Sequence, residues 1–396
     1  MEFEPIEIDP KVTRRNQRIE RVLNRVVRGA DRTRGHLRVG GRKADYDDSA
    51  YEFVGGAADD LRRKHYDKSL RLLWKAETHI PWSNFSDSSK EEKQLQEMAN
   101  KVLSPEERVQ LKRMSTADYK TMLDREYTPE QQQAIVNILS LIGHGEAYAW
   151  LVSTEVLNEV KSTGARAALT MQVLEEAKHF VVLRELLLAF DRPIPRMNVY
   201  EYILLERTFK SKGLEKFFGM NVVVEGFALS LFGMMSELPG LEVLRLFHLD
   251  ESRHTALPHN YFQEFPMSWW QKHNPRAQAH RLSLVLPAIP ILTMVENDLA
   301  VLGIDSFDFG GSMSRKILHL SERVGFHIVL PRGEFENLLN WIFNSYCSAT
   351  RPDHVEKAYL SSETTVGRPE LDVEAKVFGP GAVDAASVAA ESASAA

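Results

Sequence analysis

Two short segments of this sequence repeat the same order of residue types: an acid, a glutamate, a small residue, a base and a histidine. They read EEAKH at residues 175–179 and DESRH at residues 250–254, and each lies in an apolar stretch with helical periodicity. Residues three apart lie on one face of a helix, so the glutamate and the histidine of each segment point the same way. A lone glutamate in another apolar stretch precedes each segment: Glu146 precedes the first and Glu225 the second. The fold must therefore balance several acids and histidines inside apolar surroundings.

Six of these side chains are the predicted metal ligands: Glu146, Glu176, His179, Glu225, Glu251 and His254. Buried carboxylates without partners are costly, and two divalent or trivalent metal ions would balance them. One glutamate from each of two helices, with Glu-x-x-His from each of two more, is the pattern of dimetal carboxylate bundles. Oxygen and imidazole donors favour two iron ions or a manganese–iron pair. The alternative is a pair of ordinary ion-pair clusters in a helical core.

The charged residues beside the predicted ligands fit such a site. A metal-bound histidine usually donates its second ring N–H to a carboxylate. Glu175 and Asp250 each lie one residue before a predicted ligand, and we expect each to serve the site from across the bundle. Lys178 and Arg253 are their expected ion-pair partners. The alternative is a set of salt bridges that face solvent.

Apolar residues near the predicted ligands are candidate walls of a substrate pocket. They are Ala149, Trp150, Phe180, Leu183, Ala228, Leu229 and Phe232. A pocket with these walls would take a hydrophobic substrate; alternatively, the same side chains simply fill the core. His248 lies three residues before Glu251 and is a candidate for an additional ligand, the alternative being a core histidine.

The rest of the sequence predicts an all-α fold. Helical periodicity continues from about residue 59, while the period-two alternation typical of strands is nearly absent. Ser-Pro at 104–105 and Thr-Pro at 128–129 are typical helix starts, because the hydroxyl caps the first turn and proline fits it. The predicted ligand-bearing helices run from Thr128 toward Leu157 and over residues 165–190, 214–236 and 241–261, with two or three more between 277 and 348.

The chain divides into three regions. Residues 1–58 form a basic arm and loop, in which we expect a helix over 13–28 and a loop over 29–50. Its apolar stripe is expected to pack on the body or on a second subunit. Residues 59–350 form the helical domain, with the ligand core at 129–262. Residues 351–396 form a tail of mostly small residues that we expect to be disordered at its end.

Composition excludes several classes of protein. Lys and Arg number 49 against 55 Asp and Glu, and this mild acidic excess argues against a nucleic-acid partner. The single cysteine, Cys347, excludes an internal disulfide framework and a cysteine-based zinc or iron–sulfur site. The acidic N-terminus is unlike a signal peptide, and no uninterrupted run of about 20 apolar residues occurs. We therefore expect a cytoplasmic protein without a membrane span, and a homodimer formed through the long helices.

The motif segments resemble the ferritin-like di-iron carboxylate superfamily, which includes ribonucleotide reductase small subunits, bacterial multicomponent monooxygenases and acyl-carrier-protein desaturases. DESRH at 250–254 is close to the D-E-x-R-H motifs of the monooxygenase and desaturase branches, and VEGF at 224–227 is similar to the Glu-Gly element of R2-like proteins. LLWKAETHIPWS at 72–83 loosely resembles the lead-in of R2-like chains. The resemblance covers roughly residues 130–260. It implies a ferritin-like four-helix bundle with a dimetal centre, extended by extra N- and C-terminal helices.

The sequence also departs from these relatives. Leu183 stands where the small subunits usually carry a radical tyrosine, and no tyrosine follows Tyr359, although their docking tails contain one. Monooxygenases often place a threonine one turn after the third glutamate, whereas this chain has Ala228 and Leu229 there, followed by Ser230. These differences count against a radical-generating subunit and leave the proton-delivery group of the monooxygenases without a counterpart.

The resemblance implies an O2-dependent non-haem di-iron oxidase or oxygenase. We expect hydroxylation, desaturation or N-oxygenation of a small hydrophobic or aromatic substrate, either free or carrier-bound. The sequence holds no cysteine cluster, P-loop or dinucleotide fingerprint, so we expect an external electron-donor protein. Two alternatives are an R2-like metalloprotein that generates a redox cofactor or binds a fatty acid, and a ferroxidase or other metal-handling protein.

Overall fold

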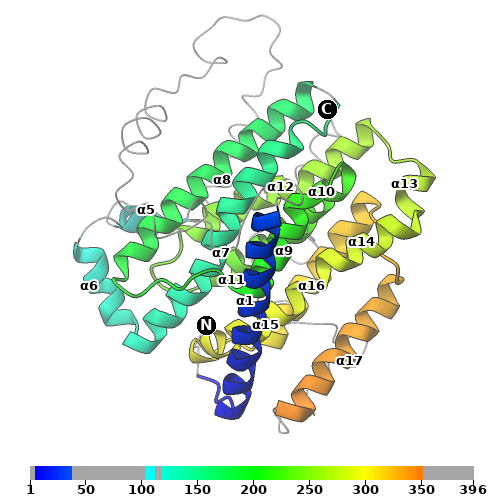
Figure 1. The fold of residues 1–396 in the computed structure, drawn as a ribbon. Helices are drawn as coiled ribbons and strands as arrows, with labels where there is room; N and C mark the ends of the chain where they lie inside the picture. The colour runs from blue at the N-terminus through cyan, green and yellow to red at the C-terminus, as the bar shows by residue number, and fades with distance from the viewer. Residues whose placement is uncertain (1–4, 38–102, 112–113, 115–116, 162, 351–396) are drawn as a thin grey trace, which may run out of the picture.

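The computed structural model describes residues 5–37, 103–111, 114, 117–161 and 163–350. This part of the chain is helical and contains no β-strand, which confirms the predicted all-α fold class (Figure 1). The predicted C-terminal tail and the segment at 72–83 lie outside the described residues.

From α6 onward the helices follow one another with short connections. The helices are α1 (Pro10–Leu37), α5 (Pro105–Leu111), α6 (Ala117–Glu126), α7 (Pro129–Val156), α8 (Thr163–Ala189), α9 (Val199–Lys210), α10 (Leu214–Phe218), η3 (Gly219–Val224), α11 (Glu225–Met235), α12 (Leu244–Glu264), α13 (Trp269–His273), α14 (Pro275–Val285), α15 (Ala288–Val301), α16 (Ser306–Val324) and α17 (Arg332–Thr350).

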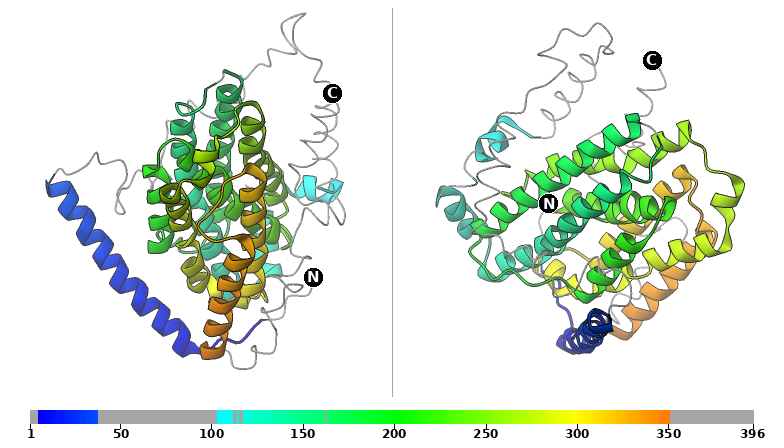
Figure 2. Two further views of the ribbon diagram at one scale, coloured as in Figure 1. Left: turned by 90° about the vertical axis from the view of Figure 1, so that its right-hand side faces the viewer. Right: turned by 45° about the horizontal axis from the view of Figure 1, so that its top comes forward.

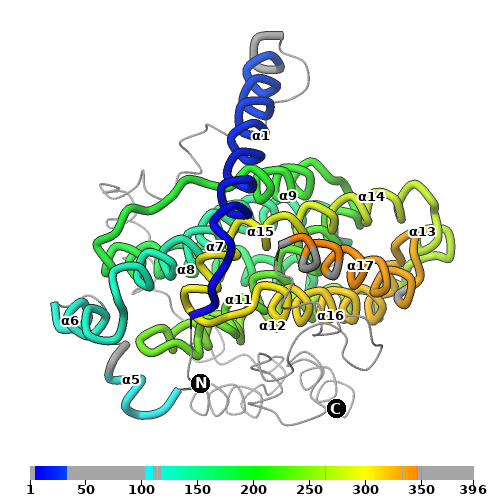
Figure 3. The backbone as a smooth tube through the Cα atoms, turned by 90° about the horizontal axis from the view of Figure 1, so that it is seen from below, coloured from blue at the N-terminus to red at the C-terminus, as the bar shows by residue number. Residues whose placement is uncertain are grey.

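Two helix pairs form the centre of the bundle. α7 packs along α8, and α11 packs along α12, while α12 also contacts α8 (Figure 1). α15 covers the other side of α7, as the view from below shows (Figure 3). The side chains of the central helices are mostly apolar and form one continuous core with those of α15 and α16. The interior of the bundle is thus enclosed by helices on several sides.

The start of α7 follows from its sequence. The hydroxyl of Thr128 accepts a bond from the Gln131 backbone N–H at 3.2 Å, and the Gln131 side chain accepts one from the Thr128 N–H at 3.0 Å. This reciprocal capping box satisfies two N–H groups that a helix start leaves without partners, and Pro129 needs none. The cap fixes the register of the helix that carries Glu146.

The helix predicted over 214–236 contains an irregularity that the sequence pattern did not indicate. Its middle, Gly219–Val224, is a π-helix, in which the Glu225 N–H bonds the Met220 carbonyl five residues back. Just beyond it, Gly226 allows a close approach to α16, since a Cβ there would lie 2.9 Å from the Ile317 side chain. The wide turn and the close approach together set the position of Glu225.

Other predictions of helix extent are wrong. Four helices, α14 to α17, occupy residues 275–350, where two or three were expected. Residues 29–37, expected to be loop, continue α1 to Leu37. α9 was not predicted, although Asn198 and Glu201 form a capping box at its start and most of its residues are buried. α1 lies on the outside of the bundle against α15 and α9 (Figure 2). Its apolar residues Ile19, Val22 and Val26 are exposed.

The expectation that the chain has no membrane-spanning segment is contradicted. Three helical stretches are long and apolar enough to cross a membrane by length and composition: Pro129–Val156, Leu214–Met235 and Pro275–Val301. The sequence criterion required an uninterrupted apolar run, and it overlooked apolar helices that carry an isolated charge such as Glu146 or Glu225. In this fold 72%, 94% and 44% of the most apolar windows of these stretches are buried inside the protein.

One partly buried contact between α7 and α15 makes stability depend on pH. Asn137 Nδ2 donates to Asp298 Oδ1 at 2.8 Å, and burial raises the pKa of Asp298 from 3.8 to about 6. The stabilisation by the neutral acid is complete below pH 3.8 and is lost as the pH rises through about 6. From pH 5 to pH 8 the wild type should therefore lose about 1 kcal/mol of unfolding free energy relative to Asp298→Asn, measured by urea denaturation. Parallel pH curves would contradict this.

Candidate metal centre

The six predicted ligands come from four helical segments and meet inside the bundle. Glu146 lies on α7, Glu176 and His179 on α8, Glu225 at the junction of η3 and α11, and Glu251 and His254 on α12. Each is at most 3% exposed. They form two overlapping groups, and within each group the candidate ligand atoms all lie within 4.8 Å of one another.

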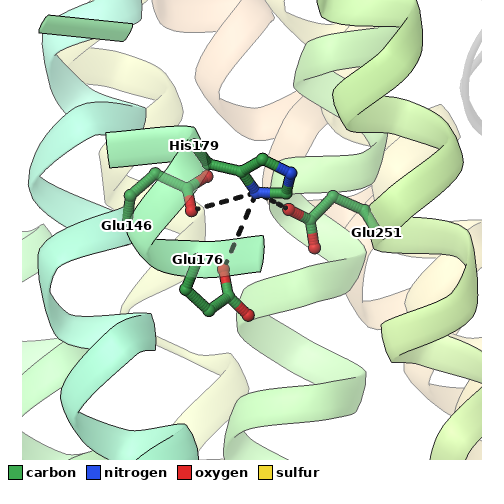
Figure 4. Close-up of side chains that lie close together, drawn as sticks. All are labelled: Glu146, Glu176, His179 and Glu251. Carbon is green, nitrogen blue, oxygen red and sulfur yellow. Dashed lines mark ion pairs between the residues drawn. The ribbon is translucent and has the colours of Figure 1, made fainter. Parts of the chain in front are cut away.

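The first group surrounds Nδ1 of His179. This nitrogen lies 3.5 Å from Glu146 Oε2, 3.8 Å from Glu176 Oε2 and 3.0 Å from Glu251 Oε1 (Figure 4). The carboxylates reach the imidazole from three different helices. All four of these polar atoms are buried, and none has a hydrogen-bond partner among the described residues.

The second group surrounds Nδ1 of His254. This nitrogen lies 3.0 Å from Glu251 Oε2, 3.3 Å from Glu176 Oε1 and 3.6 Å from Glu225 Oε1. Glu176 and Glu251 therefore present one oxygen to each group. Each group also contains one glutamate and one histidine of its own. This is the arrangement that bridging and terminal ligands of a metal pair would have.

The outer nitrogens of both imidazoles face carboxylates. His179 Nε2 lies 3.0 Å from Asp250 Oδ2, and His254 Nε2 lies 2.9 Å from Glu175 Oε2. A carboxylate accepts, so each Nε2–H donates, and with metals bound each Nδ1 would present its lone pair to the interior of the site. Asp250 belongs to α12 and Glu175 to α8, so each acid reaches the histidine of the opposite helix.

These outer acids are held by cations. Lys178 Nζ lies 2.5 Å from Asp250 Oδ2, and Arg253 contacts both Asp250 and Glu175, at 2.5 and 2.7 Å. Burial alone would raise the pKa of Glu175, but the bond from His254 and the Arg253 charge hold it below its usual value. The pKa of Asp250 is likewise lowered, because its bond with His179 and the Lys178 charge outweigh burial. Both acids are therefore kept in the charged, accepting form.

The inner groups are electrostatically crowded. Burial raises the pKa of Glu146 and of Glu225 well above the usual range, and the neighbouring acids Glu176 and Glu251 raise both further. Burial would lower the pKa of His179, but its bond with Asp250 and the nearby carboxylates of Glu146, Glu176 and Glu251 raise it well above normal. Such a cluster holds protons unless another cation replaces them. Binding of a metal would therefore release protons, as is expected of metal ligands.

A proline in α12 connects the helix backbone to the site. Pro258 has no N–H, so the carbonyl of His254, four residues earlier, lacks its usual helical bond. Asn221, on the π-helix, donates its side-chain N–H to that carbonyl at 3.0 Å. The irregular turn of η3 is thus joined to the helix turn that carries a predicted ligand.

Gln172 continues this connection into the second group. Its Oε1 accepts a bond from Asn221 at 2.8 Å, and its Nε2 donates to Glu225 Oε1 at 2.7 Å and to Glu176 Oε1 at 3.1 Å. Sequence reasoning missed both amides. Gln172 stands one helical turn before Glu176, so its spacing was a usable signal, whereas Asn221 depends on the π-helix and on a partner 33 residues away.

His248 lies outside both groups. It is buried, and its Nδ1–H donates to the Leu229 carbonyl at 2.8 Å. This bond accounts for one ring nitrogen through the main chain of α11. The structure thus places the candidate additional ligand as a histidine that joins α12 to α11.

An apolar cavity adjoins the candidate metal centre. It encloses about 440 Å³ of space between atoms, part of it open solvent, and two predicted ligands, Glu146 and Glu225, line it. The other lining residues are Leu141, Ile142, Gly145, Ala149, Glu201, Leu204, Leu205, Val224, Phe227, Ala228 and Ile291. They come from α7, α9, the η3–α11 segment and α15.

The predicted pocket walls divide into two sets. Ala149 and Ala228 line the cavity, whereas Trp150, Phe180, Leu183, Leu229 and Phe232 do not. The Trp150 side chain is 40% exposed, while Leu183 is fully buried in the core. Phe232 lies edge-on to the His179 ring, which Phe247 stacks on at a centroid distance of 4.4 Å. The predicted walls were chosen by their distance in sequence from a ligand. That distance does not tell which side of the helix faces the cavity.

Comparison of the chain with family profiles, with curated proteins and with solved structures gives no match. The resemblance to the di-iron superfamily therefore rests on the motif residues and stays a prediction.

The residues present fit a pair of divalent cations. Once deprotonated, the four carboxylates would carry four negative charges, which two divalent ions would neutralise, and the two imidazoles would offer inward lone pairs. The buried atoms without partners lie at the centre of the first group, where a cation would satisfy them. Oxygen-rich sites with imidazole suit iron and manganese.

The two overlapping groups predict how metal content changes on mutation. Glu146→Ala removes a ligand of the first group only, so about one metal per chain should remain after loading with ferrous iron. Glu225→Ala should leave about one in the other position. Glu251→Ala removes an oxygen from both groups and should leave almost none. Metal analysis and circular dichroism measure content and fold.

The matched control is Glu130→Ala, since Glu130 is an exposed glutamate at the start of α7. It should bind as much metal as the wild type. Two metals per chain in Glu251→Ala would contradict the assignment of shared ligands.

Gln172 gives a second test, because the two ligand oxygens that it contacts both belong to the second group. Gln172→Leu should lower the affinity for one of the two metals by about tenfold and leave the affinity for the other nearly unchanged. Stepwise metal titration followed by calorimetry separates the two positions. An equal loss at both, or at neither, would show that the amide does not orient the second group.

Proposed function

We propose that this chain is a ferritin-like four-helix bundle with a dimetal centre that oxidises a small apolar molecule with O2. Glu146, Glu176, His179, Glu225, Glu251 and His254 would hold two iron ions, or one manganese and one iron. The observation that carries the proposal is the apolar cavity that reaches two of these residues, Glu146 and Glu225. A site for storing or oxidising metal alone has no need of an apolar space beside its ligands.

The residues of the cavity support binding of a hydrophobic substrate. Its walls are largely aliphatic, so they favour apolar molecules. Ala149 and Ala228, each in the turn that follows a predicted ligand, have small side chains and leave room next to those ligands. A substrate in this space would lie beside carboxylates of both metal groups, which is the position that an oxidation at the metals requires.

When bound by these six ligands, iron would supply the chemistry of O2 reduction and of hydroxylation, desaturation or N-oxygenation. The protein contributes orientation and dryness. Phe247 and Phe232 enclose His179 with aromatic rings, and Leu183, one turn after His179, adds a hydrocarbon side chain where a radical tyrosine would have a phenol. These surroundings favour a reaction with a bound substrate over storage of a radical on the protein.

The proposal predicts a specific oxygen reaction. Protein loaded anaerobically with two ferrous ions per chain should consume O2 on mixing and develop a ferric absorption band in the near ultraviolet. With ascorbate as the reductant, a panel of small alkylbenzenes should contain compounds that increase O2 uptake and yield oxidised products by mass spectrometry. Glu251→Ala should do neither.

Two results would contradict it. Absence of metal after anaerobic loading would leave the six residues as a buried ion-pair cluster. Oxidation of ferrous iron without product from any apolar compound, and with iron accumulating beyond two per chain, would indicate a ferroxidase.

A further inference from the structure

Glu201 is a buried acid in the wall of the cavity, away from the predicted ligands in the sequence. It lies in the first turn of α9 and is 4% exposed. Its Oε2 accepts a long bond, 3.4 Å, from the Asn198 backbone N–H, and its Oε1 has no hydrogen-bond partner among the described residues. The nearest charged or titratable group on a facing helix is His144 of α7, whose Nδ1 lies 3.9 Å from Oε2.

The Asn198 N–H and His144 both lie at Oε2 of Glu201, and neither serves its Oε1. Apart from Glu146 and Glu225, all other side chains that line the cavity are apolar. An isolated carboxylate in such a place is costly, whereas the neutral acid is tolerated and offers one donor and one acceptor. Burial accordingly raises the pKa of Glu201 well above its usual range. The carboxyl group is thus kept as a hydrogen-bonding group within an apolar space.

We propose that Glu201 hydrogen-bonds the one neutral polar group of an otherwise apolar ligand whose hydrocarbon part occupies the cavity lined by Glu146 and Glu225. The geometry rests on a buried oxygen without a partner in the wall of a cavity that also reaches the metal groups. The catalytic meaning of this contact rests on the proposed function, while the binding itself needs no metal. Glu201 is then a specificity residue, which anchors one end of the ligand at α9.

This arrangement favours a particular class of ligand. A site that hydrogen-bonds a hydroxyl rejects the analogue without it, because the buried partner is then left unpaired. A primary ammonium group would instead require Glu201 to ionise in an apolar space. The class is therefore a small aromatic or aliphatic molecule with a single hydroxyl or comparable neutral group.

Three fluorinated probes of similar shape test the proposal: 4-fluorobenzyl alcohol, 4-fluoroethylbenzene and 4-fluorobenzylamine. They carry a hydroxyl, a methyl and an ammonium group at the same position. Binding to the metal-free full-length protein is measured by fluorine NMR. The wild type should bind the alcohol at least about tenfold more tightly than the other two.

Variants of Glu201 give the decisive comparison. Glu201→Gln keeps a donor, an acceptor and the bond to Asn198, so it should retain the preference for the alcohol. Glu201→Leu should lose it, with affinities for the alcohol and ethylbenzene within about threefold. Glu201→Met is a second hydrocarbon variant in case Glu201→Leu does not fold, and Glu185→Gln on α8 is the control outside the cavity. Circular dichroism monitors the fold of each.

Three outcomes would overturn the proposal. A preference for the alcohol that survives Glu201→Leu or Glu201→Met would place its partner elsewhere. Tightest binding of the amine, lost in Glu201→Gln, would make this a cation site. No binding of any probe to the wild type would remove the cavity as a binding site. Metal content and O2 uptake are measured separately, so their failure alongside Glu201-dependent binding would overturn only the proposed function.

Discussion

The mutual approach of four buried carboxylates and two imidazoles is the constraint on which the rest of this fold depends. Glu176 and Glu251 each present one oxygen to either group, so α8 and α12 must face each other in one register. The outer pairs of His179 with Asp250 and His254 with Glu175 lock that register from the opposite side. A shift of either helix by one residue would turn the inner acids away from the centre and separate both pairs.

Irregular backbone makes the remaining ligands fit. A regular helix would not bring Glu225 and Asn221 to their present positions, and the π-helix before Glu225 supplies the wider turn. Pro258 frees the carbonyl that Asn221 binds, so two departures from regular geometry satisfy each other. Through Gln172 the same amide connection reaches Glu225 and Glu176. The irregular backbone is thus locally less favourable than a regular helix, but it orients acids that would otherwise repel one another.

The sequence predicted what depends on period and spacing. The all-α class and the extents of the ligand-bearing helices followed from apolar periodicity and from caps such as Thr128. The contact of Asp250 with an imidazole of another helix was expected because motif spacing determines which residues share a face. The sequence analysis did not identify the π-helix, α9 or the side of each helix that faces the cavity. The π-helix and the cavity depend on packing between segments far apart in the chain. The sequence analysis also missed the helices that are long and apolar enough to span a membrane, because a glutamate interrupts an otherwise apolar run.

The difference between Glu201 and the other buried acids links the fold to recognition. Glu175 and Asp250 keep their charge because arginine and histidine groups bond them directly. The inner glutamates have one another and two imidazoles, an arrangement that a cation can complete. Glu201 has a long bond from its own helix cap and a histidine 3.9 Å from the same oxygen, and its other oxygen is buried without a hydrogen-bond partner among the described residues. Natural folds tolerate such a group when a bound molecule completes it, so the missing partner is best sought in a ligand of the cavity.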